Sequence, residues 1–302
     1  MTINPAVDPA HPAARRHIVI LQKKVMPKIL LALDAHQLKT NAIDFACYLA
    51  RLTRSRVTGV FLEDVLADRP DLAASIAYGM PLSGAPTTGE LQEQLATVTE
   101  ENIRNLREAC ICREVVSRVH RDRGVPIGEI IGESRFADFI VVDPETSFAQ
   151  RVESIPARFV SDMLVDAECP VVLSPNSFNR IDEIVFAYNG TASSVFAIKQ
   201  FTYLFPEYRE KKVQVVNVRQ EDDNSIEESF KMKEWLNEHY SQVEFHLLKG
   251  GPTDKLFGYL LDRKYAFVVM GGYGRGIISR FFRPSHARLI MRTLNLPIFI
   301  AH

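Results

Sequence analysis

Apolar stretches of two kinds alternate along the chain, and their alternation predicts a succession of strands and helices. Residues 29–33 are all apolar and are followed by a polar turn. Ala42, Phe45 and Leu49 then recur at helical spacing, and residues 57–62 form a second, mainly apolar run. Strands that read as continuous apolar runs are typical of a parallel sheet that helices cover on both faces. The pattern therefore predicts an α/β fold.

The same order of strands and helices occurs twice. Residues 28–64 and 182–222 both read as strand, helix and strand, with matching positions 155 apart. Further on, a Gly-Val-Pro tripeptide at 124–126 matches Gly-Gly-Pro at 250–252, with an offset of 126. The smaller offset means that the first copy holds about 29 extra residues. We expect them as an insertion at about residues 66–89, because this stretch is rich in turn residues.

The repeat predicts two tandem Rossmann-like domains, each with a five-stranded, mostly parallel sheet flanked by helices and with right-handed crossovers. We expect a flexible leader over residues 1–26, a first domain over 27–174 and a second over 181–302. Each copy closes with an apolar strand behind a proline, at 170–173 and 297–300. A terminal strand of this kind leaves an open sheet edge that can pair with another strand.

Composition excludes several classes of protein. The chain has 46% hydrophobic and 24% charged residues, as is usual for a soluble globular protein. Its 36 basic and 37 acidic side chains give a net charge of −1, so it has no general attraction to nucleic acid or to an anionic membrane. No apolar run is long enough to span a membrane, and the proline-rich start does not read as a secretory signal. We expect a cytoplasmic protein.

The four cysteines do not predict a metal site. Cys110 and Cys112 end a long helical pattern, and Cys47 and Cys169 lie far away in the sequence. The chain has no Cys-x-x-Cys pair, and no second Cys/His pair follows at the spacing of a zinc site. We expect buried or incidental thiols that stay reduced.

The candidate chemistry lies at the carboxyl ends of the strands, where open α/β sheets bind ligands. In the second copy a buried strand opens into residues 271–276, which hold four glycines. Glycine lets the backbone approach a ligand, and the exposed N–H groups of such a loop can bind an anion. The basic residues that follow and favour phosphate are Arg275, Arg280, Arg283 and His286. The spacing fits neither the P-loop nor the dinucleotide fingerprint, so the segment is either a ligand loop or a tight connection.

The corresponding segment of the first copy, residues 142–147, has a different character. It contains no glycine, and Asp143 and Glu145 would repel a phosphate. The second copy is therefore the better candidate. At the end of the first strand, Asp34 either contacts a ligand or caps the following helix, whereas Asn189 at the same place in the second copy is first of all a turn residue.

This order of strands, the G-x-P segments and the G-x-x-G loop together resemble the universal stress protein family, in a tandem form that covers about residues 27–302 apart from the insertion. The resemblance implies an adenine nucleotide alpha hydrolase-like fold. It also implies ATP held by G-x-x-G, nine residues and then Gly-Ser/Thr, helped by an Asp after strand one and an apolar residue after strand two.

Carried onto the second copy, the family motif predicts a cofactor site with two departures. Pro284 stands where the family has glycine and removes an N–H donor, and Asn189 stands where it has Asp and lacks the charge. The predicted site consists of Ala187, Tyr188, Asn189, Val218, Met270, Gly271, Gly272, Gly274, Arg275, Pro284, Ser285 and His286. In the first copy Asp34 fits, but Asp143, Thr146 and Pro156 replace the glycines, so that site reads as degraded.

Two functions remain open. The first is a regulatory protein that binds an adenine nucleotide, with ATP in the second domain and Mg²⁺ only together with the nucleotide. The second is a stress-response interaction module that binds no nucleotide and acts through association, because edge strands in this family commonly pair within a chain or across a homodimer. No nucleophile and base stand at catalytic spacing, since Ser285 and His286 are neighbours that point apart on a helix. We therefore expect no enzyme, although the sequence leaves slow ATP hydrolysis open.

Overall fold

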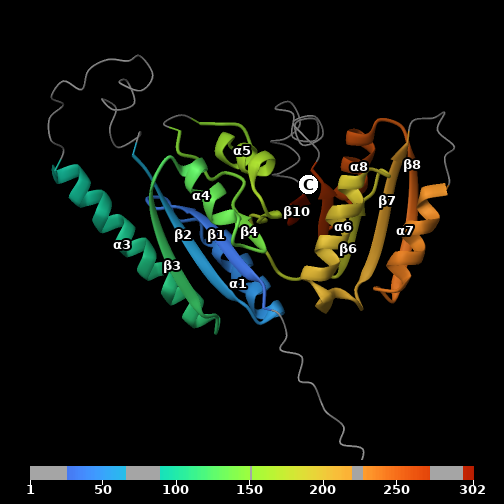
Figure 1. Cartoon of the computed structure of the whole chain (residues 1–302), viewed down its shortest axis with the longest axis horizontal. Coiled ribbons are helices and arrows are strands. Elements are labelled where there is room, and N and C mark those ends of the chain that lie inside the picture. The colour runs from blue at the N-terminus through green and yellow to red at the C-terminus, as the bar shows by residue number, and fades with distance from the viewer. Residues whose placement is uncertain (1–25, 66–88, 150–151, 220–226, 273–294) are drawn as a thin grey trace, which may run out of the picture.

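The computed structural model describes residues 26–65, 89–149, 152–219, 227–272 and 295–302. These residues form one ten-stranded sheet with helices on both faces (Figure 1). The expected leader and the expected insertion lie outside the described residues, except for Met26 and Gly89. Among the helices that are described, none is long and apolar enough to cross a membrane.

Both halves of the chain show the predicted alternation of strands and helices, which confirms the α/β class. The first half comprises β1 (Lys28–Asp34), α1 (Thr40–Thr53), β2 (Arg56–Asp64), α3 (Gly89–Cys112), β3 (Ser117–Gly124), α4 (Pro126–Ser134), β4 (Phe139–Val142), α5 (Arg158–Asp166) and β5 (Val171–Leu173). The second comprises β6 (Glu183–Ala187), α6 (Ala192–Leu204), a 3₁₀ helix η1 (Pro206–Tyr208), β7 (Lys212–Arg219), α7 (Glu227–Asn237), β8 (Gln242–Lys249), α8 (Pro252–Leu261), β9 (Ala266–Gly271) and β10 (Ile298–Ala301).

The strand order is β3-β2-β1-β4-β5-β10-β9-β6-β7-β8. Within each half all neighbouring strands are parallel, and the first strand lies between the second and the fourth. The two halves meet where β5 and β10 pair antiparallel, with Val172 opposite Phe299. The two proline-led terminal strands thus pair with each other within one chain.

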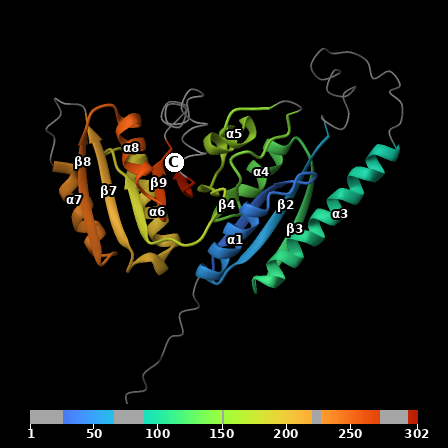
Figure 2. The same cartoon turned by 180° about the vertical axis from the view of Figure 1, so that it is seen from behind.

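Two apolar layers, one on each face of the sheet, extend across both halves. One layer packs α1, α3, α6 and α7 against the sheet, and these helices are seen in Figure 2. The other layer packs α4, α5 and α8 against the opposite face. Because the inner strands are buried on both faces, their sequences read as continuous apolar runs, whereas the edge strands β3 and β8 contain exposed polar positions.

Aromatic side chains fuse the two halves into one core. The ring centroids of Phe45 in α1 and Phe267 in β9 are 5.9 Å apart, and those of Phe139 in β4 and Phe205 after α6 are 5.3 Å apart. These separations are within the range of favourable aromatic pairs. The halves therefore share buried surface beyond the strand pair at their junction.

The two G-x-P segments begin helices. Pro126 and Pro252 are the first residues of α4 and α8, each behind an extended residue. Proline suits this position because its fixed φ fits a helix and the first turn does not need its missing N–H donor. The repeated tripeptide therefore marks the same strand-to-helix turn in both halves.

Candidate functional site

A cavity of about 280 Å³ opens at the carboxyl ends of β6, β7 and β9 in the second half. Its lining residues are Ala187, Tyr188, Asn189, Ser194, Val216, Val218, Pro252, Thr253, Leu256, Met270 and Gly271. In the sheet, β6 lies between β7 and β9, so this is the point at which the strand order reverses. Open α/β sheets bind ligands in the crevice at this point.

The structure brings six of the twelve predicted site residues together around this cavity. They are Ala187, Tyr188, Asn189, Val218, Met270 and Gly271. Gly272 is buried nearby, and its N–H donates to the carbonyl oxygen of Ala301 at 2.8 Å, which ties the end of β9 to β10. The other five predicted residues lie outside the described part of the chain: Gly274, Arg275, Pro284, Ser285 and His286.

Gly271 is a glycine for a reason that the sequence did not suggest. A Cβ atom at this position would lie 2.5 Å from the carbonyl carbon of Ser193 and 2.5 Å from the amide nitrogen of Ser194. Real Cβ atoms essentially never come so close to backbone atoms. The missing side chain therefore lets the end of β9 pack against the first turn of α6. The sequence predicts a different reason, namely that glycine makes room for a ligand.

Asn189 shapes the turn that leads from β6 into α6. Its side-chain oxygen accepts hydrogen bonds from the Thr191 N–H at 3.2 Å and from the Thr191 hydroxyl at 2.7 Å. Gly190 between them has a φ of 78°, which glycine adopts without strain. Thr191 in turn caps α6, because its hydroxyl oxygen accepts the N–H of Ser194 at 3.3 Å. Asn189 thus acts as the predicted turn residue and at the same time lines the cavity.

Five lining residues were missed by the sequence analysis: Ser194, Val216, Pro252, Thr253 and Leu256. Val216 is two positions before the predicted Val218 and so points to the same face of β7, a signal that strand periodicity offered. The G-x-P segment offered a signal for three more of these residues, because it places Pro252, Thr253 and Leu256 at the start of α8 beside the strand ends.

The cavity wall is mainly apolar, with polar groups at Tyr188, Asn189, Ser194 and Thr253, and none of the described residues that line it is charged. The first turns of α6 and α8 both contribute to it, so two helix N-termini, which carry partial positive charge, border the same space. An apolar wall with a few polar groups suits a flat heteroaromatic ring with hydrogen-bonding edges. The helix N-termini favour negative charge at its rim.

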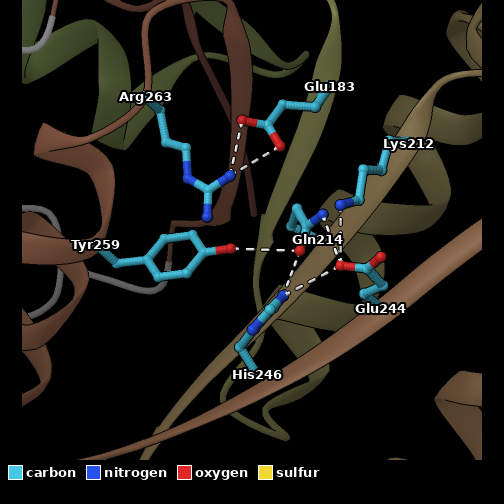
Figure 3. A network of polar contacts seen from close by, with 7 residues as sticks. All are labelled: Glu183, Lys212, Gln214, Glu244, His246, Tyr259 and Arg263. Atoms are coloured by element: carbon cyan, nitrogen blue, oxygen red, sulfur yellow. Dashed lines mark hydrogen bonds and ion pairs between the residues drawn. The ribbon is translucent and has the colours of Figure 1, made fainter.

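A polar network holds α8 against the sheet at the other end of this helix (Figure 3). The buried Gln214 of β7 donates from Nε2 to Glu244 at 3.2 Å, and its Oε1 accepts the Tyr259 hydroxyl at 3.4 Å and a hydrogen bond from His246 Nε2. Lys212 Nζ lies 3.1 Å from Glu244 and lowers the pKa of that carboxyl group through a hydrogen bond. Tyr259 thereby ties α8 to two strands.

A second contact in Figure 3 joins α8 to β6. Arg263, just after α8, donates from Nη1 to both carboxylate oxygens of Glu183 at 3.1 and 3.2 Å, and its guanidinium lies 4.5 Å from the ring centroid of Tyr259. None of the residues in these two contacts lines the cavity. These contacts hold the C-terminal end of α8 against the sheet, and they thereby fix the direction of the helix axis beside the cavity.

The loop at the same place in the first half is held by hydrogen bonds of its own residues. Asp143 after β4 is buried, and its carboxylate accepts Asn41 Nδ2 at 2.6 Å and the Glu145 N–H at 2.8 Å. The predicted Pro156 lies in a segment that folds back on this loop, where Ala157 N donates to Pro144 O at 2.9 Å. The loop after β4 is thus tied to α1 and to itself.

Asp34 forms a turn in the first half that matches the turn of Asn189. Its Oδ1 accepts the His36 N–H at 2.8 Å, and no side chain caps α1. Burial raises the pKa of the Asp34 carboxyl group, and the hydrogen bond from His36 only partly opposes this. The predicted helix cap is wrong, because Asp34 forms a turn instead, and a contact of Asp34 with a ligand stays a prediction. Among the described residues, no group of three or more His, Cys, Asp or Glu side chains is placed to hold a metal ion.

Comparison with known proteins supports the resemblance noted in the sequence. No protein-family model matches the chain. Universal stress protein Slr1230 of Synechocystis sp. is 20% identical over 291 residues, which cover 90% of this chain and 99% of that protein. The similarity therefore extends over both halves.

Solved structures confirm the fold. The crystal structure of a universal stress protein from Archaeoglobus fulgidus DSM 4304 matches with a TM-score of 0.65 and 15% identity, over 91% of this chain and 97% of that one. A protein of unknown function from Pseudomonas aeruginosa PAO1 matches with a TM-score of 0.51 and 12% identity, over 92% of each chain. Both span the two halves, so the tandem arrangement is one that known structures share.

Proposed function

We propose that this chain, a tandem member of the universal stress protein family, is a regulatory protein that binds an adenine nucleotide in its second half. The observation that carries the proposal is the cavity at the carboxyl ends of β6, β7 and β9, where the strand order reverses. The family relationship makes a stress-related regulatory role the natural setting for this site.

The cavity suits the adenine and ribose part of the ligand. Val218, Leu256 and Met270 offer an apolar surface on which a purine can stack, and Asn189 and Thr253 offer polar groups for its edges or for ribose hydroxyls. The phosphates would then extend toward the segment after Gly272. That part of the proposal rests on the sequence, in which Gly274, Arg275, Ser285 and His286 supply N–H, guanidinium, hydroxyl and imidazole groups. Mg²⁺ would arrive only with the nucleotide.

We propose binding rather than catalysis. The polar side chains among the described lining residues are those of Tyr188, Asn189, Ser194 and Thr253, which include no general base for activating a water molecule. A cytoplasmic location fits a chain whose four cysteines are all free.

A second function has its own support. The closed loop at Asp143 and the pairing of β5 with β10 fit a module that acts through association and binds no nucleotide. In that case the cavity in the second half would be the remnant of a nucleotide site. The chain would bind partners through other surfaces, or it would bind a second copy of itself.

Calorimetric titration of the full chain with ATP and Mg²⁺ distinguishes the two functions. The nucleotide function predicts saturable heat and a rise in melting temperature. Adenosine should bind more weakly through the cavity alone, and inorganic triphosphate more weakly still if the base supplies the specificity. Absence of both heat and thermal shift at millimolar ATP would leave the association function.

A filled cavity provides the matched test. Val218→Trp places a large ring in the cavity from a position that is already partly exposed. We expect it to abolish binding while the protein stays folded. Leu247→Trp on the neighbouring strand β8, where the native side chain is 58% exposed, should leave binding unchanged. Equal binding by wild type and Val218→Trp would place the ligand elsewhere.

A further inference from the structure

Two cysteines from different helices meet in the first half, far from the proposed nucleotide cavity. Cys47 in α1 and Cys110 in α3 have their sulfur atoms 3.6 Å apart, and both residues are 0% exposed. They are 63 positions apart in the sequence, so only the packing of α1 against α3 brings them together. The two thiols are hydrogen-bonded to each other.

Cys47 is one of the residues that line an open hollow of about 460 Å³, and the others are Asp44, Tyr48, Arg51, Leu52 and Arg113. Arg113 donates from Nη1 to the carbonyl oxygen of Ala109 at 2.9 Å and forms an ion pair with Asp44. A small polar molecule such as hydrogen peroxide in this hollow thus lies beside Cys47 and a guanidinium group.

The two thiols are not equivalent. The hydrogen bond with Cys47 lowers the pKa of Cys110, and a hydrogen bond from Ser117 and the positive charge of Arg113 lower it further, against the opposing effect of burial. The same hydrogen bond raises the pKa of Cys47, and burial adds to this. The contact between the sulfur atoms thus favours ionisation of one thiol of the pair, with the other thiol as its hydrogen-bond donor.

We propose that Cys47 and Cys110 are a peroxide-responsive thiol pair that forms a reversible intramolecular disulfide. The thiolate of one of the two cysteines attacks one oxygen of hydrogen peroxide, the O–O bond breaks, and the hydroxide that leaves takes up the proton released by that thiol to become water. The sulfur of the other cysteine then attacks the sulfenic sulfur, the S–S bond forms and the S–O bond breaks. The departing hydroxide takes the proton of the second thiol, so that two thiols and one peroxide give one disulfide and two waters.

The reaction requires a small movement of the two helices. The sulfur atoms must approach from 3.6 Å to about 2.05 Å, a change that side-chain rotation and a slight shift of α3 toward α1 can supply. The disulfide would tie α3 to α1. Asn102 of α3 donates from Nδ2 to the carbonyl oxygen of Ala35, directly after β1, at 2.8 Å. Oxidation would therefore also restrict the carboxyl end of β1.

The other two cysteines serve as internal comparisons. Cys112 lies two positions after Cys110 on the same helix and is exposed, so peroxide reaches it freely. Cys169, before β5, is half-buried, and burial raises its pKa to about 12. The contact between two sulfur atoms that defines the pair is formed by Cys47 and Cys110 and involves neither Cys112 nor Cys169.

The experiment uses the full chain carrying Cys112→Ser and Cys169→Ser, which leaves the pair itself intact. The protein is treated with hydrogen peroxide, unfolded in the presence of N-ethylmaleimide and weighed by mass spectrometry. We expect the loss of two hydrogen atoms with no alkylation, a monomer of increased mobility on a non-reducing gel, and full alkylation at both positions after dithiothreitol. Peptide mapping should identify the Cys47–Cys110 link.

Single substitutions complete the test. Adding either Cys110→Ser or Cys47→Ser to this background should abolish the intramolecular disulfide, because the remaining thiol then has no partner sulfur at 3.6 Å. The proposal is overturned if both thiols stay alkylatable after peroxide treatment of the doubly substituted chain. It is overturned equally if that chain forms only covalent dimers.

Discussion

The phenolic hydroxyl groups of Tyr48 and Tyr208 lie 3.0 Å apart, and they join α1 of the first half to the 3₁₀ helix of the second. Tyr208 is fully buried and also stacks on Phe201, with ring centroids 6.0 Å apart. Burial raises the pKa of Tyr208, so it stays neutral and able to hydrogen-bond throughout the physiological range. This contact is a specific polar link beside the aromatic side chains that join the halves.

We expect Tyr208→Phe to lower the free energy of unfolding by about 1 kcal/mol, because it removes one hydrogen-bonding partner and leaves the Tyr48 hydroxyl without this contact. Urea unfolding of the full chain measures the change. Tyr203→Phe is the control, since that side chain is 57% exposed and its loss of a hydroxyl should cost less than about 0.5 kcal/mol. Equal values for both variants would contradict a stabilising role for the contact.

Asp34→Asn should make the protein more stable at neutral pH. Burial raises the pKa of Asp34 in the folded state above its unfolded value of about 3.9, so the unfolded chain ionises first as the pH rises. The wild-type protein loses stability between that value and the raised folded pKa, whereas Asn does not ionise and still offers Oδ1 to the His36 N–H. The variant should match wild type near pH 3 and exceed it at pH 7. The pH dependence of urea midpoints tests this, and a gain that is equally large at pH 3 would contradict it.

Gly271→Ala should destabilise the protein by about 1–3 kcal/mol, because the new methyl group overlaps the backbone of Ser193 and Ser194. It should also weaken any nucleotide binding, since the first turn of α6 must move. Gly258→Ala is the matched control on α8. Nothing lies within 4 Å of the Cβ added there, and alanine should stabilise this helix by about 0.5–1 kcal/mol. A Gly271→Ala protein as stable as wild type would show that this contact can relax.

Glu183→Gln should lower the free energy of unfolding by about 1–2 kcal/mol. It leaves the Arg263 guanidinium without its anionic partner at a place where the two side chains are only 16% and 27% exposed. Partial solvent access keeps the loss below that of a fully buried pair. The exposed pair of Arg180 and Asp182, with side chains 63% and 47% exposed, is the control, and Asp182→Asn should change stability by less than about 0.5 kcal/mol. Chemical denaturation of both variants decides whether burial makes the difference.

The sequence predicted the fold well because the inner strands are buried on both faces. Runs such as residues 29–33 contain no polar residue, in contrast to strands with one exposed face, in which every second residue is polar. The helical stripe of Ala42, Phe45 and Leu49 marks the buried face of α1. The repeat then fixed the number of strands in each half. What the sequence left open was whether the terminal strands pair within the chain or between chains, because both arrangements bury the same residues of β5 and β10.

The candidate site was predictable only where it follows the strands. Asn189, Val218 and Met270 come at or just after strand ends and could be found by position alone. Thr253 and Leu256 follow the G-x-P turn, but their place at the cavity also depends on the packing of α8 over the sheet, which Tyr259 and Arg263 support. The meeting of Cys47 with Cys110 escaped the sequence analysis for a similar reason, since it depends on the packing of two helices that a long segment separates.

The pairing of β5 with β10 within one chain determines how the first and second halves associate and in what ratio. When two separate chains associate, the fraction that is paired falls with dilution, and two different chains can also form the wrong pairs. Here both partners belong to one chain, so the pairing is unimolecular and does not depend on protein concentration. The ratio of the two halves is always one to one. One half can therefore lose its ligand site through mutation, and the pair still assembles with the other half unchanged.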